Sequence, residues 1–344
     1  MVRKRITMEQ IARDANVSRT TVSFVLNQTP NTNISESTRL RVLETAFKLG
    51  YYDSNDATNF VAFVMHQTPD QIAQDALLGE VLRGVSSAIE PYGYHVGLFP
   101  VPLDSPLHYL NLLITRRPKG IILSGPITKD SEALGQLVQQ NVPVVIQGQV
   151  ENPRIYCVDV ENVYSAQTAV QHLIELGHHH IAIITNASLS YTASADRLKG
   201  YRRALAEGGI AFDETLVRYG DFTSLSGYKA MIDLLTMHPT PPSAVFVASD
   251  VVALGAMQAA RQWGLNIPQD ISFVGFDDIP LASYLNPPLT TVRILAGDLG
   301  HRAGQILMGL IQNESALPHR TLLDSQLKVR GSTQPHESAR KGGI

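Results

Sequence analysis

The chain has 344 residues, of which 44% are hydrophobic, and a net charge of −3 at pH 7, so it is too long for one simple domain and can bury a sizeable core. Its one cysteine, Cys157, lies between apolar residues and cannot form an internal disulfide, which favours a buried inert thiol in a reducing compartment. We expect no secretory signal, because Met1–Arg5 is followed by a polar amphipathic segment, and no membrane span, because no apolar stretch approaches spanning length. We therefore expect a cytoplasmic protein.

The segment Thr7–Asn27 has the layout of two short helices joined by a tight turn. Thr7 and Gln10 stand three residues apart, in the reciprocal arrangement that caps the start of a helix. Asn16 tolerates the left-handed backbone of a turn, and Ser18 is a good cap for a second helix. These signals predict a helix-turn-helix.

The second of these helices has one apolar face and one polar face. Val22, Val25 and Leu26 recur at helical spacing. The other face carries side chains that form hydrogen bonds: Arg19, Thr20, Thr21, Ser23 and Asn27. Such a helix can lie in the major groove of DNA, with its first turn facing the base edges. From this pattern alone, the alternative is an amphipathic hairpin that only packs against the rest of the protein.

A third helix follows, with Ser35 as its cap and Gly50 as its terminator. Three helices within about 50 residues make a small autonomous domain of the kind that carries this motif. Residues 1–52 hold eight Lys and Arg against four Asp and Glu, a net charge of +4, which leaves −7 for the rest of the chain. The positive charge is therefore concentrated where a phosphate backbone would need it.

From Phe60 onward, short apolar runs alternate with helical segments, the pattern of parallel strands covered by helices. The predicted strands are 61–65, 95–99, 120–123, 143–146, 181–184, 244–248 and 271–276, and the predicted helices lie near 76–90, 106–116, 132–140, 195–207 and 251–263. This pattern predicts a doubly wound α/β core, whose ligands bind beyond the carboxyl ends of the strands. No G-x-G-x-x-G or phosphate loop is present, so we expect no nucleotide cofactor.

Four stretches can be compared with known families: TMEQIARDANVSRTTVSFVLN at 7–27, HLIELGHHHIAII at 172–184, RLKGYRRAL at 197–205, and the long segment 248–293, from ASDVVALG to PPLTTVR. Together they resemble the lactose-repressor and purine-repressor (LacI/GalR) family of bacterial transcription regulators. The resemblance implies an all-α helix-turn-helix head without a wing and an α/β core of two doubly wound subdomains of the periplasmic-binding-protein type. It also implies a cleft between the subdomains and a homodimer. The first subdomain would take roughly 61–159 and the second roughly 163–288, with the chain crossing back near Thr291 and Leu322.

The same resemblance assigns roles in the head position by position. It implies base reading by Arg19, Thr20 and Phe24, and contacts to the DNA backbone or support of the fold by Ser18, Thr21, Ser23 and Asn27. Arg19 could bond a guanine in bidentate fashion, which discriminates by about 1–3 kcal/mol. Phe24 could offer only an apolar contact, for example to a thymine methyl group, and its alternative role is packing against the neighbouring helix.

In the cleft, the resemblance implies that Arg197 and Asp277 bind the effector, as a donor fork and an acceptor that together grip vicinal hydroxyls or a polar ring edge. Phe222 corresponds to an aromatic wall on which a flat sugar or base can stack, with a core role as the alternative. Tyr191 aligns with another contact position. Asp250 follows a predicted strand, so it is a candidate both for an effector ligand and for a helix cap.

Two further features bear on the ligand. Gly148 stands between Gln147 and Gln149, where many relatives carry an acidic residue, and neutral amides suit hydroxyls better than cations, which favours a sugar-like neutral effector. The triple His178, His179 and His180 looks like a metal cluster, but consecutive side chains point apart, so we expect no metal site.

The connection between head and core departs from the family pattern. Relatives continue with a short hinge helix whose leucine wedges into the minor groove, whereas 53–59 reads DSNDATN, with no leucine, no Lys or Arg, and two acids. These polar, turn-forming residues favour a tight linker, and a diverged ordinary hinge is the alternative. We expect no minor-groove wedge and therefore less bending of the DNA.

We therefore expect a helix-turn-helix domain at 1–52, an atypical linker at 53–59, an effector-binding and dimerisation core at 60–335, and a disordered tail at 336–344. The expected function is that of a homodimeric transcription regulator, a repressor rather than an activator, that binds a pseudo-palindromic operator in double-stranded DNA under control of a small-molecule effector. The alternatives are a solute-binding protein, which normally needs an export signal, and a small-molecule enzyme, which would need a group opposite the adjacent carboxylates Asp277 and Asp278. We expect no catalytic site.

Overall fold

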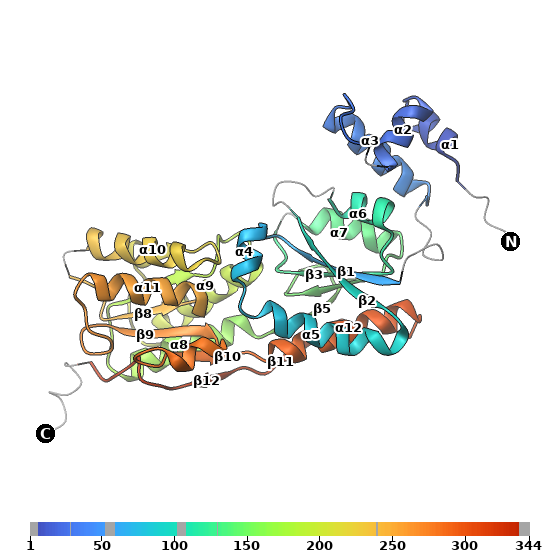
Figure 1. Cartoon of the computed structure of the whole chain (residues 1–344). Helices are drawn as coiled ribbons and strands as arrows, with labels where there is room; N and C mark the ends of the chain where they lie inside the picture. The colour runs from blue at the N-terminus through green and yellow to red at the C-terminus, as the bar shows by residue number, and fades with distance from the viewer. Residues whose placement is uncertain are drawn as a thin grey trace, which may run out of the picture.

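The computed structural model describes residues 6–27, 29–51, 59–101, 108–128, 130–238 and 240–336. The head consists of α1 (Met8–Asp14), α2 (Arg19–Leu26) and α3 (Glu36–Lys48) (Figure 1). Each helix begins at the polar residue expected from the sequence: the hydroxyls of Thr7, Ser18 and Ser35 accept hydrogen bonds from the backbone three residues on. Asn16 adopts a left-handed φ of 51° in the turn. The helix-turn-helix is therefore confirmed.

The head has its own apolar centre, formed where the three helices meet. Its fully buried members come from each helix in turn: Ile11, Val22, Val25, Val42 and Ala46. Arg41 fastens α3 to the turn, because its Nε donates to the carbonyl of Ala15 at 2.9 Å. The head lies against the core, where α3 packs on α6 (His108–Arg116) and the guanidinium of Arg117 lies 5.9 Å from the centre of the Tyr51 ring (Figure 1).

The first subdomain is a six-stranded parallel sheet in the order β11-β5-β4-β3-β1-β2. Its strands are β1 (Phe60–Met65), β2 (His95–Pro100), β3 (Ile121–Ser124), β4 (Val144–Gln147), β5 (Tyr156–Val160) and β11 (Arg320–Leu323). On one face lie α6 and α7 (Asp130–Gln139), and on the other α5 (Leu78–Ile89) and α12 (Ala296–Ile311), which pack on each other (Figure 1). A short helix, α4 (Pro69–Gln74), and a 3-10 turn (Glu90–Tyr92) flank α5.

The second subdomain repeats this arrangement, with the strand order β12-β10-β9-β8-β6-β7. Its strands are β6 (Ile181–Thr185), β7 (Val217–Tyr219), β8 (Ala244–Val247), β9 (Ser272–Asp277), β10 (Thr290–Arg293) and β12 (Gln326–Lys328). Its helices are α8 (Asn162–Glu175), α9 (Thr192–Glu207), α10 (Ser224–Met237) and α11 (Asp250–Gln262), with 3-10 turns at Glu214–Leu216 and Pro280–Tyr284. Only β12, which joins β10, runs antiparallel in this sheet of described residues.

The chain crosses between the subdomains three times, after β5, after β10 and between β11 and β12 (Figure 1). All seven predicted strands are present, and the two doubly wound sheets confirm the expected fold class. Five strands were not predicted: β5, β7, β10, β11 and β12. These strands have three to five residues, and all five carry a charged residue, so their sequences lack the continuous apolar run of a central parallel strand.

Close helix packing in the second subdomain depends on glycine. A Cβ on Gly255 of α11 would lie 1.7 Å from the carbonyl oxygen of Ser224, and one on Gly227 of α10 would lie 1.9 Å from that of Val252. The two helices therefore touch backbone to backbone, which fixes the position of Asp250 at the start of α11.

The remaining predictions about the chain as a whole concern its ends and its relation to membranes. No helix among the described residues combines the length and the apolar character needed to cross a bilayer. The linker 53–59 lies outside the described residues except for Asn59, as does the tail from 337 onward. His336 is described, and its amide donates to the carbonyl of Leu176 at 2.8 Å.

Candidate functional site: a DNA-reading helix and an effector cleft

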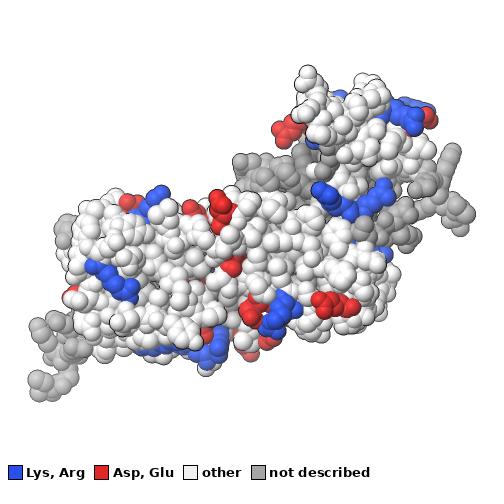
Figure 2. All heavy atoms as spheres, in the orientation of Figure 1, with Lys and Arg blue, Asp and Glu red and all other residues white. Residues whose placement is uncertain are grey.

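The exposed face of α2 carries the residues predicted to read bases. Arg19 and Thr20 are exposed in its first turn, and Phe24, one turn on, is 37% exposed and contributes nothing to the apolar centre of the head. The alternative role for Phe24, packing against a neighbouring helix, is therefore not supported. In Figure 2, basic side chains gather on the head and along its border with the core.

The residues predicted to contact the DNA backbone surround this face. The Ser18 hydroxyl accepts from the backbone N–H of Thr21 at 3.0 Å and lies 2.9 Å from the Thr21 hydroxyl. The amide of Asn27 donates to the Ser23 hydroxyl at 3.2 Å. Ser18 and Thr21 lie at the amino-terminal end of α2, which favours an anion such as phosphate, whereas Ser23 and Asn27 lie toward its carboxyl end.

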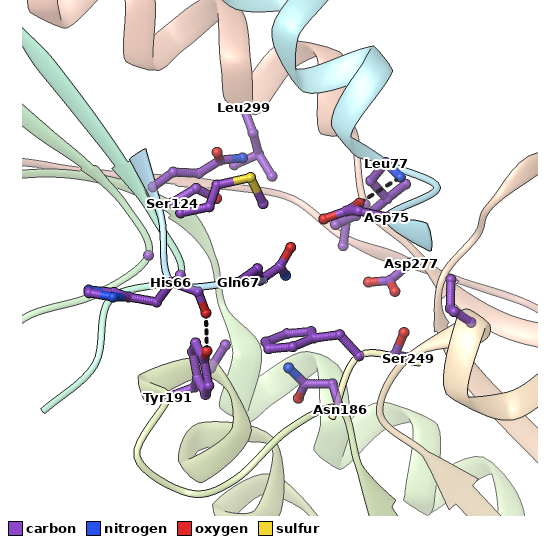
Figure 3. Close-up of a pocket in the computed structure, with 18 of the residues that line it drawn as sticks. His66, Gln67, Asp75, Leu77, Ser124, Asn186, Tyr191, Ser249, Asp277 and Leu299 are labelled. Atoms are coloured by element: carbon purple, nitrogen blue, oxygen red, sulfur yellow. Dashed lines mark hydrogen bonds between the residues drawn. The ribbon is translucent and has the colours of Figure 1, made fainter. Parts of the chain in front are cut away.

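The second site is a cavity between the two subdomains, at the carboxyl ends of the parallel strands (Figure 3). The first subdomain contributes His66, Gln67, Asp75, Ser124 and Gln147, among others, and the second contributes Asn186, Tyr191, Arg197, Phe222, Ser249 and Asp277. This is the place where the fold class predicts a ligand. Of the five predicted effector ligands, four line this cavity and Asp250 does not.

Arg197 is buried in the wall of the cavity and held from several sides. Its Nε donates to Asn162 Oδ1 at 2.9 Å, and its Nη1 donates to the carbonyl of Ala248 at 2.7 Å. The guanidinium carbon lies 3.8 Å from the centre of the Phe276 ring, within cation–π range. Nη1 is 3.9 Å from the nearer carboxylate oxygen of Asp277. The side chain is thus fixed in one orientation toward the ligand space.

Asp277 ends β9 in an uncommon backbone conformation, with a φ of 119°, and Asp278 follows with a φ of 57°. Such positive φ values in residues other than glycine cluster at functional sites. Burial raises the pKa of Asp277 to about 6, and the nearby Arg197 counteracts this rise. Asp278 is engaged elsewhere, because its two oxygens pair with Arg330 and, at 3.0 Å, with Arg293.

Tyr191 and Phe222 form the aromatic part of the cavity. Their rings meet edge to face, with centroids 4.9 Å apart and an interplanar angle of 88°. Phe222 holds a φ of 69° while its N–H donates to the carbonyl of Asn186 at 2.8 Å, so its backbone is constrained. The Tyr191 hydroxyl donates to the carbonyl of His66 in the first subdomain (Figure 3). Tyr191 therefore joins the two subdomains as well as lining the cavity.

The prediction for Asp250 requires a correction. Its Oδ1 accepts from the Thr291 hydroxyl at 2.6 Å and its Oδ2 accepts from the N–H of Ile279 at 3.0 Å. Asp250 is the first residue of α11, whose cap position is occupied by Ser249, and it is fully buried away from the cavity. Its carboxylate ties the loop after β9 and strand β10 to α11, so it supports the ligand wall without facing the ligand.

Several lining residues were not predicted from the sequence. Ser249 and Asn186 follow strands β8 and β6, the places where the fold class puts ligand residues, so strand ends alone could have indicated them. Asp75 and Gln67 lie in the segment between β1 and α5, which has no recognisable motif. Of the neutral amides noted above, Gln147 lines the cavity, whereas the amide of Gln149 is directed to the carbonyl of Val160 at 3.4 Å.

A buried polar cluster lies directly behind the cavity. His66 Nε2 is 2.9 Å from Asp130 Oδ1 and 2.7 Å from the Tyr109 hydroxyl, which also donates to Asp130 at 2.9 Å. The other oxygen of Asp130 accepts from the N–H of Ile127 at 2.8 Å. These contacts fix His66, whose carbonyl receives the Tyr191 bond, relative to α6 and α7.

The histidine triple has an ordinary structural explanation. His178 Nδ1 lies 3.0 Å from the Ser243 hydroxyl and its Nε2 lies 3.1 Å from the carbonyl of Gln334. Burial lowers the pKa of His178 to about 4, which keeps the ring neutral at pH 7. Within the part of the chain that the structure describes, no group of three His, Cys, Asp or Glu could hold a metal ion.

Both parts of the chain, the head and the core, are similar to known protein families. Residues 7–54 match the model of bacterial regulatory proteins of the lacI family, and residues 170–333 match a periplasmic binding protein-like domain. The transcriptional regulator CelR of Thermobifida fusca is 33% identical over 96% of this chain and 99% of its own. Catabolite control protein A of Priestia megaterium is 34% identical over the same shares.

Solved structures agree with these sequence relationships. A CelR–cellobiose complex superimposes with a TM-score of 0.75 at 33% identity, covering 95% of this chain and 100% of that one. The lac repressor dimer bound to operator and the anti-inducer ONPF superimposes with a TM-score of 0.69 at 27% identity, covering 96% of this chain and 100% of that one.

Proposed function

Because this chain belongs to the lacI family of bacterial regulatory proteins, we propose that it is a repressor that binds a pseudo-palindromic operator and is controlled by a sugar bound in the cleft. It is a transcription regulator with a DNA-binding head and a periplasmic-binding-protein-like core. The observation that carries the proposal is that the chain has two separate sites: an exposed polar recognition helix in the head and a cavity at the boundary of the two subdomains.

For the head, we propose that Arg19, Thr20 and Phe24 read base edges while Ser18, Thr21, Ser23 and Asn27 contact the backbone. The exposure of all three base-reading candidates on α2 supports these roles. Base contacts set the preferred sequence, whereas backbone contacts set register and overall affinity. A homodimer would present two such helices to half-sites about one helical turn apart, or a multiple of it.

For the cleft, we propose that Arg197 and Asp277 grip hydroxyl groups of a sugar while Phe222 covers one face of its ring. The fixed guanidinium of Arg197, the carboxylate of Asp277 nearby and the aromatic ring on the same cavity wall support these roles. Tyr191 contributes by its ring contact with Phe222 and by its bond to the first subdomain. The cellobiose in the CelR complex is consistent with a carbohydrate in a cleft of this architecture.

Coupling between the two sites would arise from the angle between the subdomains. Effector bound in the cleft contacts both subdomains, so it stabilises one angle over others, and the first subdomains of the dimer transmit that angle to the spacing of the heads. Such coupling is typically about 1–3 kcal/mol and reciprocal, so operator DNA would change effector affinity by the same factor. We further propose that 1–52 is the DNA-binding domain, 53–59 a short linker without a minor-groove wedge, and 60–335 the effector-binding and dimerisation core.

Selection of bound sequences from a random DNA pool, repeated with a panel of sugars, tests this proposal. We expect an enriched sequence with two-fold symmetry and at least one sugar that changes its recovery. Enrichment of no sequence, or turnover of a sugar by the purified protein, would contradict the proposed function.

A further inference from the structure

Acidic side chains outnumber basic ones in the cavity, and Asp75 is central to this imbalance. Among the described residues that line it, three carboxylates (Asp75, Asp159 and Asp277) stand against one guanidinium, that of Arg197. Arg197 directs donors to Asn162 and Ala248, and Asp159 is occupied by the N–H of Val160 at 2.8 Å and the amide of Asn162 at 2.9 Å. Each carboxylate keeps some capacity for a ligand, and Asp75 and Asp277 come from the two different subdomains.

Asp75 is held by the start of α5. Its Oδ1 accepts from the N–H groups of Leu77 and Leu78, each at 3.0 Å. A carboxylate accepts about four hydrogen bonds, so these two leave capacity for a ligand. No ion pair among the described residues includes Asp75, and burial raises its pKa. It is therefore a fixed acceptor that lacks a cationic partner.

Asp277 approaches from the other subdomain. Its nearest cationic partner is Arg197, whose Nη1 lies 3.9 Å from the carboxylate, beyond ordinary hydrogen-bond length. In Figure 3, the carboxylates of Asp75 and Asp277 point toward the same part of the cavity. Their mutual repulsion contributes to the raised pKa of Asp277. Without a donor between them, two like charges face each other across the cleft.

Two amide oxygens add to the excess of acceptors. Gln67 Oε1 and Gln147 Oε1 are both inaccessible to solvent and have no hydrogen-bond partner, although both residues line the cavity. A buried acceptor without a partner is costly unless a ligand supplies the donor.

We infer that Asp75 is a specificity-determining residue of the cleft, which accepts a hydrogen bond from a hydroxyl or ammonium group of the effector and excludes ligands that place an anion there. This inference rests on the proposed function, since it concerns the same cleft. It assigns the effector to uncharged or aminated sugars and excludes sugar phosphates and uronates. The donor lies between Asp75 and Asp277, so the ligand joins the two subdomains through one group of each.

The test begins with a thermal-shift screen of the full chain against common neutral mono- and disaccharides, cellobiose included, and their amino, uronate and 6-phosphate counterparts. Hits are titrated by calorimetry at pH 7.5. We expect binding by a neutral or amino sugar and none by its anionic counterparts. Tighter binding of the amino form would identify the donor as an ammonium group, and tighter binding of the neutral form a hydroxyl. If no neutral or amino sugar binds, or if a uronate or phosphate binds as tightly, the inference is wrong.

The variant Asp75→Asn keeps an acceptor for α5 but removes the charge. We expect it to raise the dissociation constant of the bound sugar about tenfold or more, because a charge-assisted hydrogen bond is lost. Asp75→Ser, which can also cap a helix, should do the same, so two variants guard against a folding defect. Asp70→Asn is the matched control, because Asp70 is exposed on α4 and does not line the cavity. Unchanged affinity in both Asp75 variants would overturn the inference.

Operator titration of the same samples separates this inference from the proposed function. If the parent binds a neutral or amino sugar through Asp75 but binds no operator, the proposed regulator is wrong while the role of Asp75 stands. If operator binding responds to a sugar whose affinity is the same in the Asp75 variants, the proposed function stands and the role of Asp75 is wrong.

Discussion

The guanidinium of Arg197 lies 3.8 Å from the centre of the Phe276 ring, on the strand whose next residue is Asp277. Both proposed effector ligands are thus positioned by one strand end, β9. The ammonium group of a lysine is not planar, so it could not stack on the Phe276 ring while also donating to Asn162 Oδ1 and to the carbonyl of Ala248. The orientation toward the ligand therefore depends on arginine.

We expect Arg197→Lys to weaken sugar binding at least about tenfold while leaving operator affinity in the absence of sugar unchanged. Calorimetry with the sugar and anisotropy with the operator measure the two effects. Arg202→Lys is the matched control, because Arg202 also lies over an aromatic ring, Phe212 at 4.3 Å, but is exposed on the same helix α9. Equal loss of sugar binding in both variants would contradict the role of Arg197.

Asp277 should make the unliganded protein less stable above about pH 6 than in acid. Its pKa is raised from its ordinary value near 3.8 to about 6 by burial, with Asp75 adding repulsion and Arg197 opposing it. A carboxyl group whose pKa is raised in the folded state makes its full contribution to the stability of the fold below pH 3.8. This contribution is lost as the pH rises through about 6. Asp277→Asn removes the ionisation and keeps a residue that tolerates positive φ.

The difference in melting temperature between Asp277→Asn and the parent should therefore increase from about pH 4 to about pH 7 and stay constant at higher pH, while sugar binding is lost. Differential scanning calorimetry across this range measures the difference. A constant difference at all pH values would show that Asp277 ionises normally in the folded protein.

Gly255 provides a test of the packing that positions Asp250. A Cβ there would lie 1.7 Å from the Ser224 carbonyl, so Gly255→Ala must push α10 and α11 apart, which we expect to reduce the free energy of unfolding by about 1–3 kcal/mol. Gly135→Ala is the matched control, because Gly135 lies in α7 with nothing within 4 Å of the added carbon. That change should be neutral or stabilising by up to about 1 kcal/mol, since alanine favours helix. Urea denaturation measures both, and equal midpoints would contradict the close packing.

Sequence reasoning succeeded where a structure is specified locally. The three head helices follow from their capping residues Thr7, Ser18 and Ser35 and from apolar spacing, and each central strand reads as a continuous apolar run. Strands such as β5 (Tyr156–Val160) are short and carry a charged residue, so they form only because neighbouring strands pair with them.

The cleft was predictable in part. Arg197 and Asp277 follow from resemblance to a family, and both line the cavity. Asp250 adjoins the same sheet edge, but its side chain turns toward Ile279 and Thr291, a direction that strand order alone does not determine. Asp75 and Asp277 come from different subdomains and meet only in the folded cleft, so no local pattern could have paired them.

The linker predicts little bending of the operator. Residues 53–59 contain no leucine and carry two acids, so no apolar wedge is available to unstack the central base step. In a circular-permutation gel-shift assay we expect nearly constant mobility as the operator is moved along the fragment. Strong, position-dependent retardation centred on the operator would show that a wedge is present after all. Replacing Ala57 by leucine tests whether an added apolar side chain restores bending.

The measurement that decides whether the head reads DNA is an anisotropy titration of the selected operator and of a scrambled duplex of equal length at fixed salt. We expect the parent to prefer the operator and Arg19→Ala to lose about 1–3 kcal/mol of that preference. Lys229→Ala, which makes the same charge change at an exposed position on α10, should retain the preference. Equal, salt-sensitive binding of the parent to both duplexes, or an unchanged preference in Arg19→Ala, would contradict the assignment of the head as a sequence-reading domain.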